Sequence, residues 1–391
     1  MVTGLSALFT PSEEAKFLDC FARKEVALLS GDADAIGHLV SIDEIGRLLA
    51  NGTLQSPRIR VSRSGNTVPE LVWSTKDGPV DVPALQGLMN KGASLIIDNL
   101  APLVPTLLRL EHAIERKLGS QTLINAYLTE KKGGAFGAHY DNHDVLIVQV
   151  LGEKTWELFA PTERPADSRR EWRQSLPHPK DVIVERQLRA GQMLLIPRGT
   201  WHRASVNDGA MSLHLTVTII SLNGHDYARW VLEQLEGDDL VCTDIPRLGG
   251  AGALALYEQA VNDRIAANLK ANDLSRFLAE KDGERVPVAT SGLAGFVTPD
   301  DMDLLVPAMR RRLAEDQGNG GSLEVRASGQ THRLNEAMRA ALLAVDDSET
   351  GLSYGALASN LSTRWTREIV EDSIRRLTVK GLVTIKPGRE T

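Results

Sequence analysis

The sequence predicts an α+β protein in which a β-rich domain precedes helical segments. Between residues 122 and 222, short runs of β-forming residues alternate with turn residues, which is typical of a sandwich or barrel rather than a parallel α/β sheet. After Gly224 long helical patterns replace the strands, and the C-terminal part reads helix, helix, helix, strand, the order of a winged helix. For 391 residues we expect three domains, over 1–225, 226–300 and 301–391.

Composition is that of an ordinary globular protein, with 42% hydrophobic and 24% charged residues. The two cysteines, Cys20 and Cys242, lack C-x-x-C spacing, which argues against a disulfide framework or thiolate zinc site and favours a reducing cytoplasm. The net charge of −7 argues against nucleic-acid binding through bulk charge. Because the chain has no signal pattern and no apolar run of roughly 18 residues, we expect a cytoplasmic protein without a membrane partner.

Periodicity predicts the elements in order. In the first third, Ser41 is a plausible N-cap, and Glu44 would complete a capping box. We expect helices over residues 13–29, 41–50 and 104–118, and strands over 58–62 and 94–97. In the β-rich part we expect strands over 123–128, 145–151, 155–159, 193–196 and 212–220. Gly152, between two of these strands, predicts a turn and an antiparallel return.

The C-terminal elements follow from the same patterns. We expect helices over 226–236, 252–268, 334–344, 354–361 and 366–380, a glycine-rich turn or linker over 316–322, and a strand over 382–385. The helix over 366–380 carries charges of both signs: Arg367, Arg375, Arg376 and Lys380 with Glu368, Glu371 and Asp372. Because DNA readers concentrate positive charge on this helix, we interpret the domain as structural or protein-binding and expect no nucleic-acid partner.

The motif His139-Tyr140-Asp141 is the strongest chemical signal. Residues two apart on a strand point to one face, so an imidazole and a carboxylate are delivered together. His202 follows a strand and a Pro-Arg-Gly turn, 61 residues after Asp141 (202 − 141), which is enough chain to cross the sheet and return. Two histidines and one carboxylate are the ligand set of non-haem iron oxygenases. An isolated His-x-Asp, by contrast, is more often a surface or core pair.

Lys154 and Tyr127 predict a pocket for a carboxylate. Lys154 lies 13 residues after Asp141 (154 − 141), beyond Gly152, where a returning strand would bring it back to the metal. A buried lysine needs a carboxylate partner, and 2-oxoglutarate offers its distal one. Tyr127, on the strand before the motif, is placed to donate a second hydrogen bond. The alternative for Lys154 is a solvated turn lysine.

Other histidine and tryptophan side chains near the motif are explained by packing or hydrogen bonding as well as by a role in the site. His143 continues the alternation of the motif and is either another ligand or, as we favour, a rim or hydrogen-bonding residue of the substrate pocket. His214 is interpreted as a core histidine with its hydrogen bonds satisfied. Trp156 and Trp201 are interpreted as packing residues, with Trp201 alternatively bordering a substrate channel.

Five strings together resemble the Jumonji-C family and, within it, the ribosomal-oxygenase branch. They are NAYLT at 125–129, HYD at 139–141, the run 145–156 ending in GEKTW, PRGTWH at 197–202 and SLHLTVT at 212–218. The resemblance implies a double-stranded β-helix (jelly roll, cupin) in the first domain, a helical dimerisation domain, a C-terminal winged helix and a homodimer. It also implies Fe(II), 2-oxoglutarate and dioxygen as cofactor and cosubstrates.

The resemblance implies the roles of single residues. The iron ligands are His139, Asp141 and His202. Lys154 and Tyr127 bind the distal carboxylate of 2-oxoglutarate, and Thr218 and Asn125 line the cosubstrate or substrate pocket. Glu130 departs from the family, in which proline commonly follows NAYLT.

The implied reaction is hydroxylation of a protein side chain, arginine or histidine of a ribosomal protein. Alternatives on the same fold are hydroxylation of a peptide natural product and lysine demethylation. An alternative from another class is a non-catalytic cupin-like scaffold that uses the winged helix as its binding module.

Overall fold

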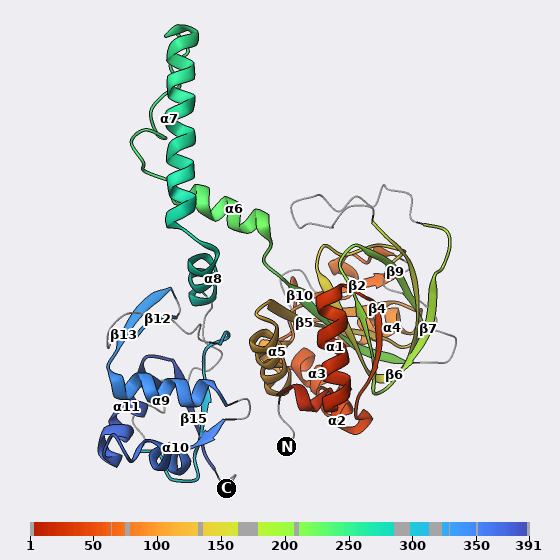
Figure 1. The fold of residues 1–391 in the computed structure, drawn as a ribbon. Coiled ribbons are helices and arrows are strands. Elements are labelled where there is room, and N and C mark those ends of the chain that lie inside the picture. The colour runs from red at the N-terminus through yellow and green to blue at the C-terminus, as the bar shows by residue number, and fades with distance from the viewer. Residues whose placement is uncertain are drawn as a thin grey trace. The chain divides into compact units, whose positions relative to one another are not determined.

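A computed structural model describes residues 4–63, 65–74, 79–131, 136–162, 179–206, 211–284, 298–312, 323–327, 329–348 and 351–388. The chain divides into two compact units, Met1–Ser221 and Leu222–Thr391 (Figure 1). The predicted boundary at residue 225 lies four residues (225 − 221) beyond this division. The finer division of the second unit at residue 300 stays a prediction.

The first unit is built on a large antiparallel sheet with the strand order β1-β8-β6-β10-β5-β4-β2-β3. These strands are β1 (Ala27–Ser30), β8 (Gln192–Ile196), β6 (Asp144–Pro161), β10 (Ser212–Ile220), β5 (Gln121–Thr129), β4 (Ser94–Ile97), β2 (Ile59–Arg63) and β3 (Asn66–Thr67). Register aligns residues in rows across the sheet, and one row places Tyr127 between Ile96 of β4 and His214 of β10. Directly opposite residues share a face of the sheet, so these side chains are neighbours.

A second, smaller sheet shares strand β6 with the first. Beyond Gly152, β6 pairs with β7 (Val184–Arg189) on one side and β9 (Thr200–Ser205) on the other. Side chains of the two sheets meet in one apolar cluster that includes Ile147, Leu194 and Leu158. Two facing antiparallel sheets of this kind form the jelly roll that the sequence predicted.

Gly152 does not make the predicted turn. Residues 144–161 form one continuous strand of 18 residues in place of two strands that reverse direction. Gly152 takes a φ of 67°, which glycine adopts without the steric cost that a Cβ imposes, and its carbonyl accepts the Ala190 N–H at 3.0 Å. The chain therefore bends from the first sheet into the second, and Lys154 reaches the interior on the second sheet.

Helices cover the outer face of the large sheet (Figure 1). They are α1 (Pro11–Arg23), α2 (Ala33–Gly37), α3 (Ile42–Ala50), α4 (Val82–Met89) and α5 (Pro105–Leu118), with short 3₁₀ turns at Gly4–Ala7, Glu70–Val72 and Ala101–Leu103. The predicted helix over 13–29 is wrong in its second half. Lys24, with a φ of 56°, ends α1, and residues 27–30 instead pair with β8 as strand β1. Ser41 caps α3 by accepting the Glu44 N–H at 3.0 Å, as predicted.

The second unit begins with three helices, α6 (Gly224–Glu233), α7 (Gly250–Ala271) and α8 (Leu274–Gly283). Trp230, Val231 and Phe277 form a small core between α6 and α8. Helix α7 has 22 residues, none of them buried, and it extends beyond the other two helices (Figure 1). The sequence predicted α6 and α7 but missed α8.

The rest of the second unit has its own core, centred on the fully buried Leu342, Leu357 and Ile374. Its elements are β11 (Leu304–Pro307), β12 (Leu323–Ala327), β13 (Gln330–Leu334), α9 (Glu336–Asp346), β14 (Leu352–Ser353), α10 (Tyr354–Leu361), α11 (Arg367–Val379) and β15 (Val383–Lys386). The three helices and final strand match the prediction. The central strand of the sheet β14-β11-β15 comes from upstream of the helices, which sequence did not indicate. The predicted linker over 316–322 lies outside the described residues.

The basic residues of α11 are paired with acids. Arg367 contacts Asp301, and Arg375 and Arg376 both contact Asp372 at 2.7 Å. These pairs reduce the positive charge that the helix presents. In the described ranges, no helix is long and apolar enough to cross a membrane.

Candidate metal centre and cosubstrate pocket

His139, Asp141 and His202 meet at one end of the barrel. Their ligand atoms all lie within 4.8 Å of one another, and His202 Nε2 is 3.6 Å from Asp141 Oδ2. His202 is carried by β9, and residue 139 lies beside it through two backbone hydrogen bonds of 3.0 and 2.7 Å. The three side chains therefore lie together as predicted, but residues 139–141 do not form the expected strand: residue 139 makes an isolated bridge to residue 202, and residues 140 and 141 follow without regular structure.

Hydrogen bonds select the tautomer of both histidines. His139 Nδ1 donates to the Gly137 carbonyl at 2.9 Å, and His202 Nδ1 donates to the Thr200 carbonyl at 3.0 Å. A carbonyl only accepts, so each Nδ1 carries the proton and each Nε2 offers a lone pair. Burial, reinforced by His139, lowers the pKa of His202 to about 4 even though Asp141 raises it, so the ring stays neutral. Two imidazoles whose Nε2 atoms face one carboxylate suit a divalent transition metal.

His143 lies outside this cluster. Its Nδ1 is 2.9 Å from Asn142 Oδ1, and burial lowers its pKa. Among the described residues, the group with metal-ligand geometry consists of the other two histidines and Asp141. The alternative of His143 as a ligand is therefore wrong, and its role in the substrate pocket stays a prediction.

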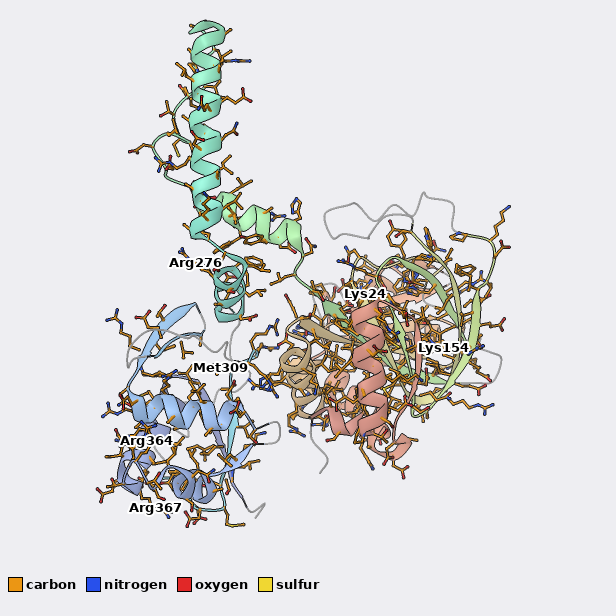
Figure 2. All side chains as sticks on the ribbon, in the orientation of Figure 1. Lys24, Lys154, Arg276, Met309, Arg364 and Arg367 are labelled. Atoms are coloured by element: carbon orange, nitrogen blue, oxygen red, sulfur yellow. The ribbon has the colours of Figure 1, made fainter. Side chains whose placement is uncertain are left out.

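Lys154 lies inside the barrel, on the second sheet (Figure 2). Its side chain is 2% exposed, so the alternative of a solvated turn lysine is wrong. No carboxylate of the described residues lies within ion-pair distance of its ammonium, and burial lowers its pKa to about 7. A buried cation without a counter-charge is costly, and an anionic ligand would remove that cost.

Tyr127 faces the same interior from the large sheet. Its ring stacks on His214 with centroids 4.9 Å apart and planes at 8°. Burial raises the pKa of Tyr127, with smaller raising effects from Asp98 and Asp141 and an opposing effect from Arg60. The phenol therefore lies near the metal ligand Asp141 as well as near Asp98.

His214 is not the satisfied core histidine that the sequence suggested. It is 2% exposed, and its Nδ1 has no hydrogen-bond partner among the described residues. Trp156 lies edge-on to it, with ring centroids 5.5 Å apart, and the Trp156 indole N–H is also unpartnered there. Burial and the charge of Lys154 lower the pKa of His214. The His214 ring therefore stays neutral. It stacks on Tyr127 and lies near enough to Lys154 to respond to its charge.

Comparison with known proteins bears on the same part of the chain. The JmjC domain family matches residues 103–227, which include all three ligands, Lys154, Tyr127 and His214. Residues 103–227 are a Jumonji-C domain. The matched residues hold strands β5 to β10 around the candidate metal ligands, whereas strands β1 to β4 and helices α1 to α4 precede them.

Two relatives are known as enzymes. The chain is 26% identical over 217 residues to the bifunctional lysine-specific demethylase and histidyl-hydroxylase NO66 of Drosophila pseudoobscura pseudoobscura, which covers 55% of this chain and 22% of that protein. It is 27% identical over 164 residues to ribosomal oxygenase 1 of Rattus norvegicus, covering 41% and 25%. The chain thus spans about a quarter of the length of these relatives.

A solved structure resembles the chain over nearly its whole length. It is the ribosomal oxygenase YcfD of Escherichia coli in complex with cobalt and 2-oxoglutarate, with a TM-score of 0.57 and 17% identity over 96% of this chain and 98% of that one. At this identity the likeness concerns the fold. It includes the second unit as well as the JmjC domain.

The structure places the remaining predicted residues around the JmjC pocket. Asn125 shares the inner face of β5 with Tyr127, and its Oδ1 accepts the Asn99 N–H at 2.8 Å. Thr218 shares the inner face of β10 with His214 and is 6% exposed. Trp201 packs against Tyr140, with centroids 5.0 Å apart, on the opposite face of β9 from His202. Packing is thus its observed contact, and the functional roles of all three stay predictions.

Sequence reasoning missed an ion pair beside Tyr127. Arg60 Nε and Nη2 donate to Asp98 Oδ2 and Oδ1 at 2.7 and 2.8 Å. Arg60 lies in the same row of the sheet as Tyr127, separated by Ile96. No local pattern predicts this pair, because it depends on the pairing of β2, β4 and β5.

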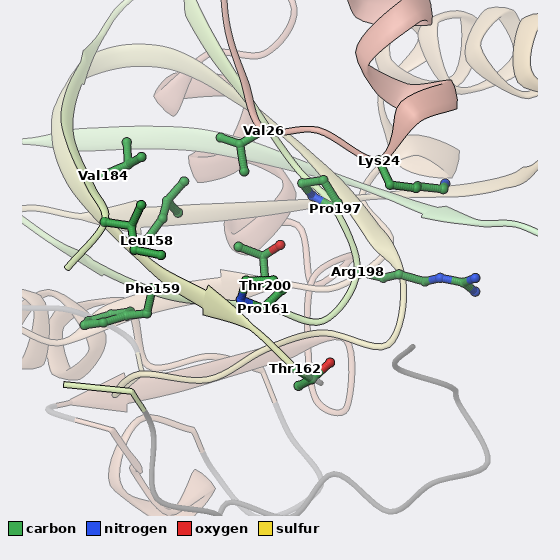
Figure 3. A pocket seen from close by; sticks show the side chains of 11 residues that line it. Lys24, Val26, Leu158, Phe159, Pro161, Thr162, Val184, Pro197, Arg198 and Thr200 are labelled. Atoms are coloured by element: carbon green, nitrogen blue, oxygen red, sulfur yellow. The ribbon is translucent and has the colours of Figure 1, made fainter. Parts of the chain in front are cut away.

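A separate cavity of about 600 Å³ opens in the JmjC domain (Figure 3). It is lined by Lys24, Val26, Leu158, Phe159, Pro161, Thr162, Ile183, Val184, Pro197, Arg198 and Thr200. The Lys24 ammonium pairs with the buried Asp144 at 2.6 Å, and Asp144 also accepts the Arg198 N–H at 3.0 Å. The metal-ligand candidates do not line this cavity.

Proposed function

We propose that this chain is an iron(II)- and 2-oxoglutarate-dependent oxygenase that hydroxylates a side chain of a ribosomal protein. The observation that carries the proposal is the combination, in one barrel, of the two-histidine, one-carboxylate cluster with the buried Lys154, which has no acidic partner among the described residues. The names of the two relatives, a histidyl-hydroxylase and a ribosomal oxygenase, support the reaction class. The fold likeness to YcfD with cobalt and 2-oxoglutarate supports the cofactor.

Iron(II) would be held by Nε2 of His139, Nε2 of His202 and a carboxylate oxygen of Asp141. These donors fit the metal because both Nδ1 atoms are occupied by backbone carbonyls, which leaves Nε2 of each ring for the metal, and the three ligand atoms converge within 4.8 Å. When bound, iron with 2-oxoglutarate and dioxygen supplies the oxidation, in which one oxygen atom enters a substrate C–H bond and the other enters succinate as carbon dioxide is released.

The chain's own residues bind and orient. The Lys154 ammonium would bind the distal carboxylate of 2-oxoglutarate, which supplies the counter-ion that the described residues do not give this buried cation. Tyr127, Asn125 and Thr218 line the surrounding walls. The apolar cluster around Leu158 and Ile147 limits water between the sheets. Hydrogen bonds from the two Nδ1 atoms to backbone carbonyls keep both imidazoles oriented toward the metal.

Mass spectrometry tests the reaction and substrate together. Ribosomal proteins from host cells with and without the gene are compared by intact mass, and tandem spectra locate any change. We expect one ribosomal protein to be lighter by the mass of one oxygen atom in the deletion strain. Returning the unaltered gene to that strain should restore the mass, and returning the His139→Ala gene should not. Unchanged ribosomal proteins would refute the substrate class. Normal hydroxylation by His139→Ala would refute the metal centre.

We further infer that the chain is a homodimer and that residues 226–300 form its dimerisation domain. Helix α7 supports this, because its 22 residues include no buried side chain even though Tyr257 and Asn268 donate hydrogen bonds to the Thr243 and Val231 carbonyls of the same unit. Leu256 on α7 is 71% exposed, and Leu254 and Leu269 are 40% and 45% exposed. A second copy would cover these side chains.

We infer that residues 301–391 form a winged helix that contacts protein. The order of helices α9, α10 and α11 and strand β15 supports the fold assignment. The ion pairs of Arg367, Arg375 and Arg376 support a protein contact over a phosphate-binding surface.

A further inference from the structure

Three donors surround one part of the JmjC interior. Lys154 offers an ammonium, Trp156 offers an indole N–H that no described residue accepts, and His214 offers a ring nitrogen that is likewise unpartnered. Trp156 lies two residues from Lys154 on the same face of β6, and its ring lies 5.5 Å from that of His214. The Lys154 charge is close enough to lower the pKa of His214. The three side chains therefore form one group.

The side chains of Lys154, Trp156 and His214 have few hydrogen-bond acceptors near them among the described residues. Gln149, opposite His214 in the sheet, has an unpartnered Oε1, and its amide nitrogen already donates to Ser212 Oγ at 2.9 Å. One amide oxygen is a weak complement for an ammonium, an indole N–H and an imidazole N–H. Buried donors are normally paired, so an acceptor with several lone pairs and a negative charge is missing. A carboxylate has both.

We propose that His214 donates a ring N–H to the distal carboxylate of 2-oxoglutarate, beside Lys154. This inference rests on the proposed 2-oxoglutarate site and adds a recognition residue to it. His214 is held for this task on both sides, by the parallel ring of Tyr127 at 4.9 Å and the perpendicular ring of Trp156. A neutral imidazole has one N–H and one lone pair, and the carboxylate selects the tautomer that donates.

The same contacts assign Tyr127 the positioning of His214 in place of the predicted hydrogen bond to the distal carboxylate. Its ring positions His214, while its hydroxyl lies near enough to Asp98 and Asp141 for both to act on its pKa. The carboxylate of the cosubstrate is then bound from the second sheet by Lys154 and from the first sheet by His214. Selectivity for 2-oxoglutarate over uncharged 2-oxo acids follows from both groups.

Two substitutions separate hydrogen bonding from packing. His214→Phe keeps a flat ring against Tyr127 and removes the donor, whereas His214→Gln removes the ring and keeps an amide N–H. Each variant is loaded with Mn(II), and its dissociation constants are measured for 2-oxoglutarate and for 2-oxopentanoate, which lacks the distal carboxylate. His225→Phe, an exposed histidine in α6, is the matched control.

We expect His214→Phe to weaken 2-oxoglutarate binding about tenfold or more, the effect of one hydrogen bond to a charged group. Its affinity for 2-oxopentanoate should stay unchanged, and His214→Gln should bind 2-oxoglutarate more tightly than His214→Phe. The inference is overturned if His214→Phe binds 2-oxoglutarate normally, or if it loses affinity equally for both 2-oxo acids. Failure of the unaltered protein to bind 2-oxoglutarate would instead refute the proposed function.

A measurement on the unaltered protein guards against a variant that does not fold. Nitrogen-15 spectra of the Zn(II)-loaded chain report the tautomer of each imidazole. Saturating 2-oxoglutarate should shift the His214 ring nitrogens toward a single hydrogen-bonded tautomer, and 2-oxopentanoate should not. Unchanged His214 signals with bound 2-oxoglutarate would overturn the inference.

Discussion

Lys154 and the candidate metal ligand His202 lie in the same barrel, and burial shifts the pKa of both in the same direction. Removal from water disfavours a cation, so burial lowers the pKa of Lys154 to about 7 and that of His202 to about 4. For His202 the result is a ring that is neutral at physiological pH, as a metal ligand must be. For Lys154 the result is a side chain that is about half charged at neutral pH until an anion arrives.

This balance predicts that the affinity for 2-oxoglutarate falls as pH rises. A bound carboxylate favours the charged lysine. Because the pKa of free Lys154 is lowered to about 7, binding is accompanied by proton uptake at pH values above this pKa, where the free side chain is neutral. With Mn(II) saturating, we expect binding at pH 8 to be about tenfold weaker than at pH 6. Isothermal titration calorimetry at several pH values measures the effect.

Lys154→Met is the control for this pH dependence. It should bind 2-oxoglutarate weakly, with an affinity that no longer changes over the same range, because the titrating group is gone. An affinity of the unaltered protein that is flat or rises with pH would contradict the assignment of Lys154.

At the scale of elements, strand β6 connects the two parts of the site. Its first half pairs with β8 and β10, and its second half pairs with β7 and β9, so the bend at Gly152 decides where Lys154 points. The backbone at the bend leaves no space for a side chain on residue 152. A Cβ at residue 152 would overlap the Met211 carbonyl oxygen, and the φ of 67° disfavours any side chain there.

We predict that Gly152→Ala lowers the free energy of unfolding by at least about 2 kcal/mol, from the left-handed backbone and the overlap together. Urea denaturation measures this loss. Gly87→Ala is the matched control, because Gly87 lies inside α4 with nothing within 4 Å of an added Cβ. That variant should be stabilised by about 0.5 to 1 kcal/mol. Equal stability of the two variants would show that the bend does not depend on glycine.

At the scale of the whole molecule, the second unit carries the exposed apolar side chains of α7. Single exposed leucines are common, but a helix of 22 residues without any buried residue lacks the apolar packing that stabilises most helices, and a partner would supply it. The JmjC site lies wholly within the first unit. Association and cosubstrate binding are therefore separable by substitution.

We predict that Leu254→Glu combined with Leu256→Glu converts a dimer into a monomer, because burying two carboxylates in an apolar contact is unfavourable. Light scattering coupled to size exclusion measures the mass, and 2-oxoglutarate affinity should not change. Gln259→Glu adds charge at a polar position of the same helix and should leave the dimer intact. A monomeric unaltered protein would refute the dimer, and a dimeric double variant would refute α7 as its contact.

Local pattern was enough for much of the fold and for the metal ligands. The His-x-Asp spacing indicated that His139 and Asp141 act together, although residues 139–141 form an isolated bridge in place of the expected strand, and periodicity located β4, β10 and α10 at their observed bounds. These inferences succeed because neighbours in the chain determine which way a side chain points within one element. The identity of the donors then indicates the metal.

Tertiary structure decided what depends on pairing between distant strands. Residues 27–29 were expected in a helix and instead belong to β1, because pairing with β8 outweighs local helical preference. His214 meets Tyr127 across 87 residues of chain (214 − 127), and Arg60 meets Asp98 through the pairing of β2 with β4. A sequence read alone gives spacing along the chain but not the register between strands. The cluster of candidate metal ligands and the inward position of Lys154 could thus be predicted from sequence, whereas the contacts of His214 and of Arg60 could not.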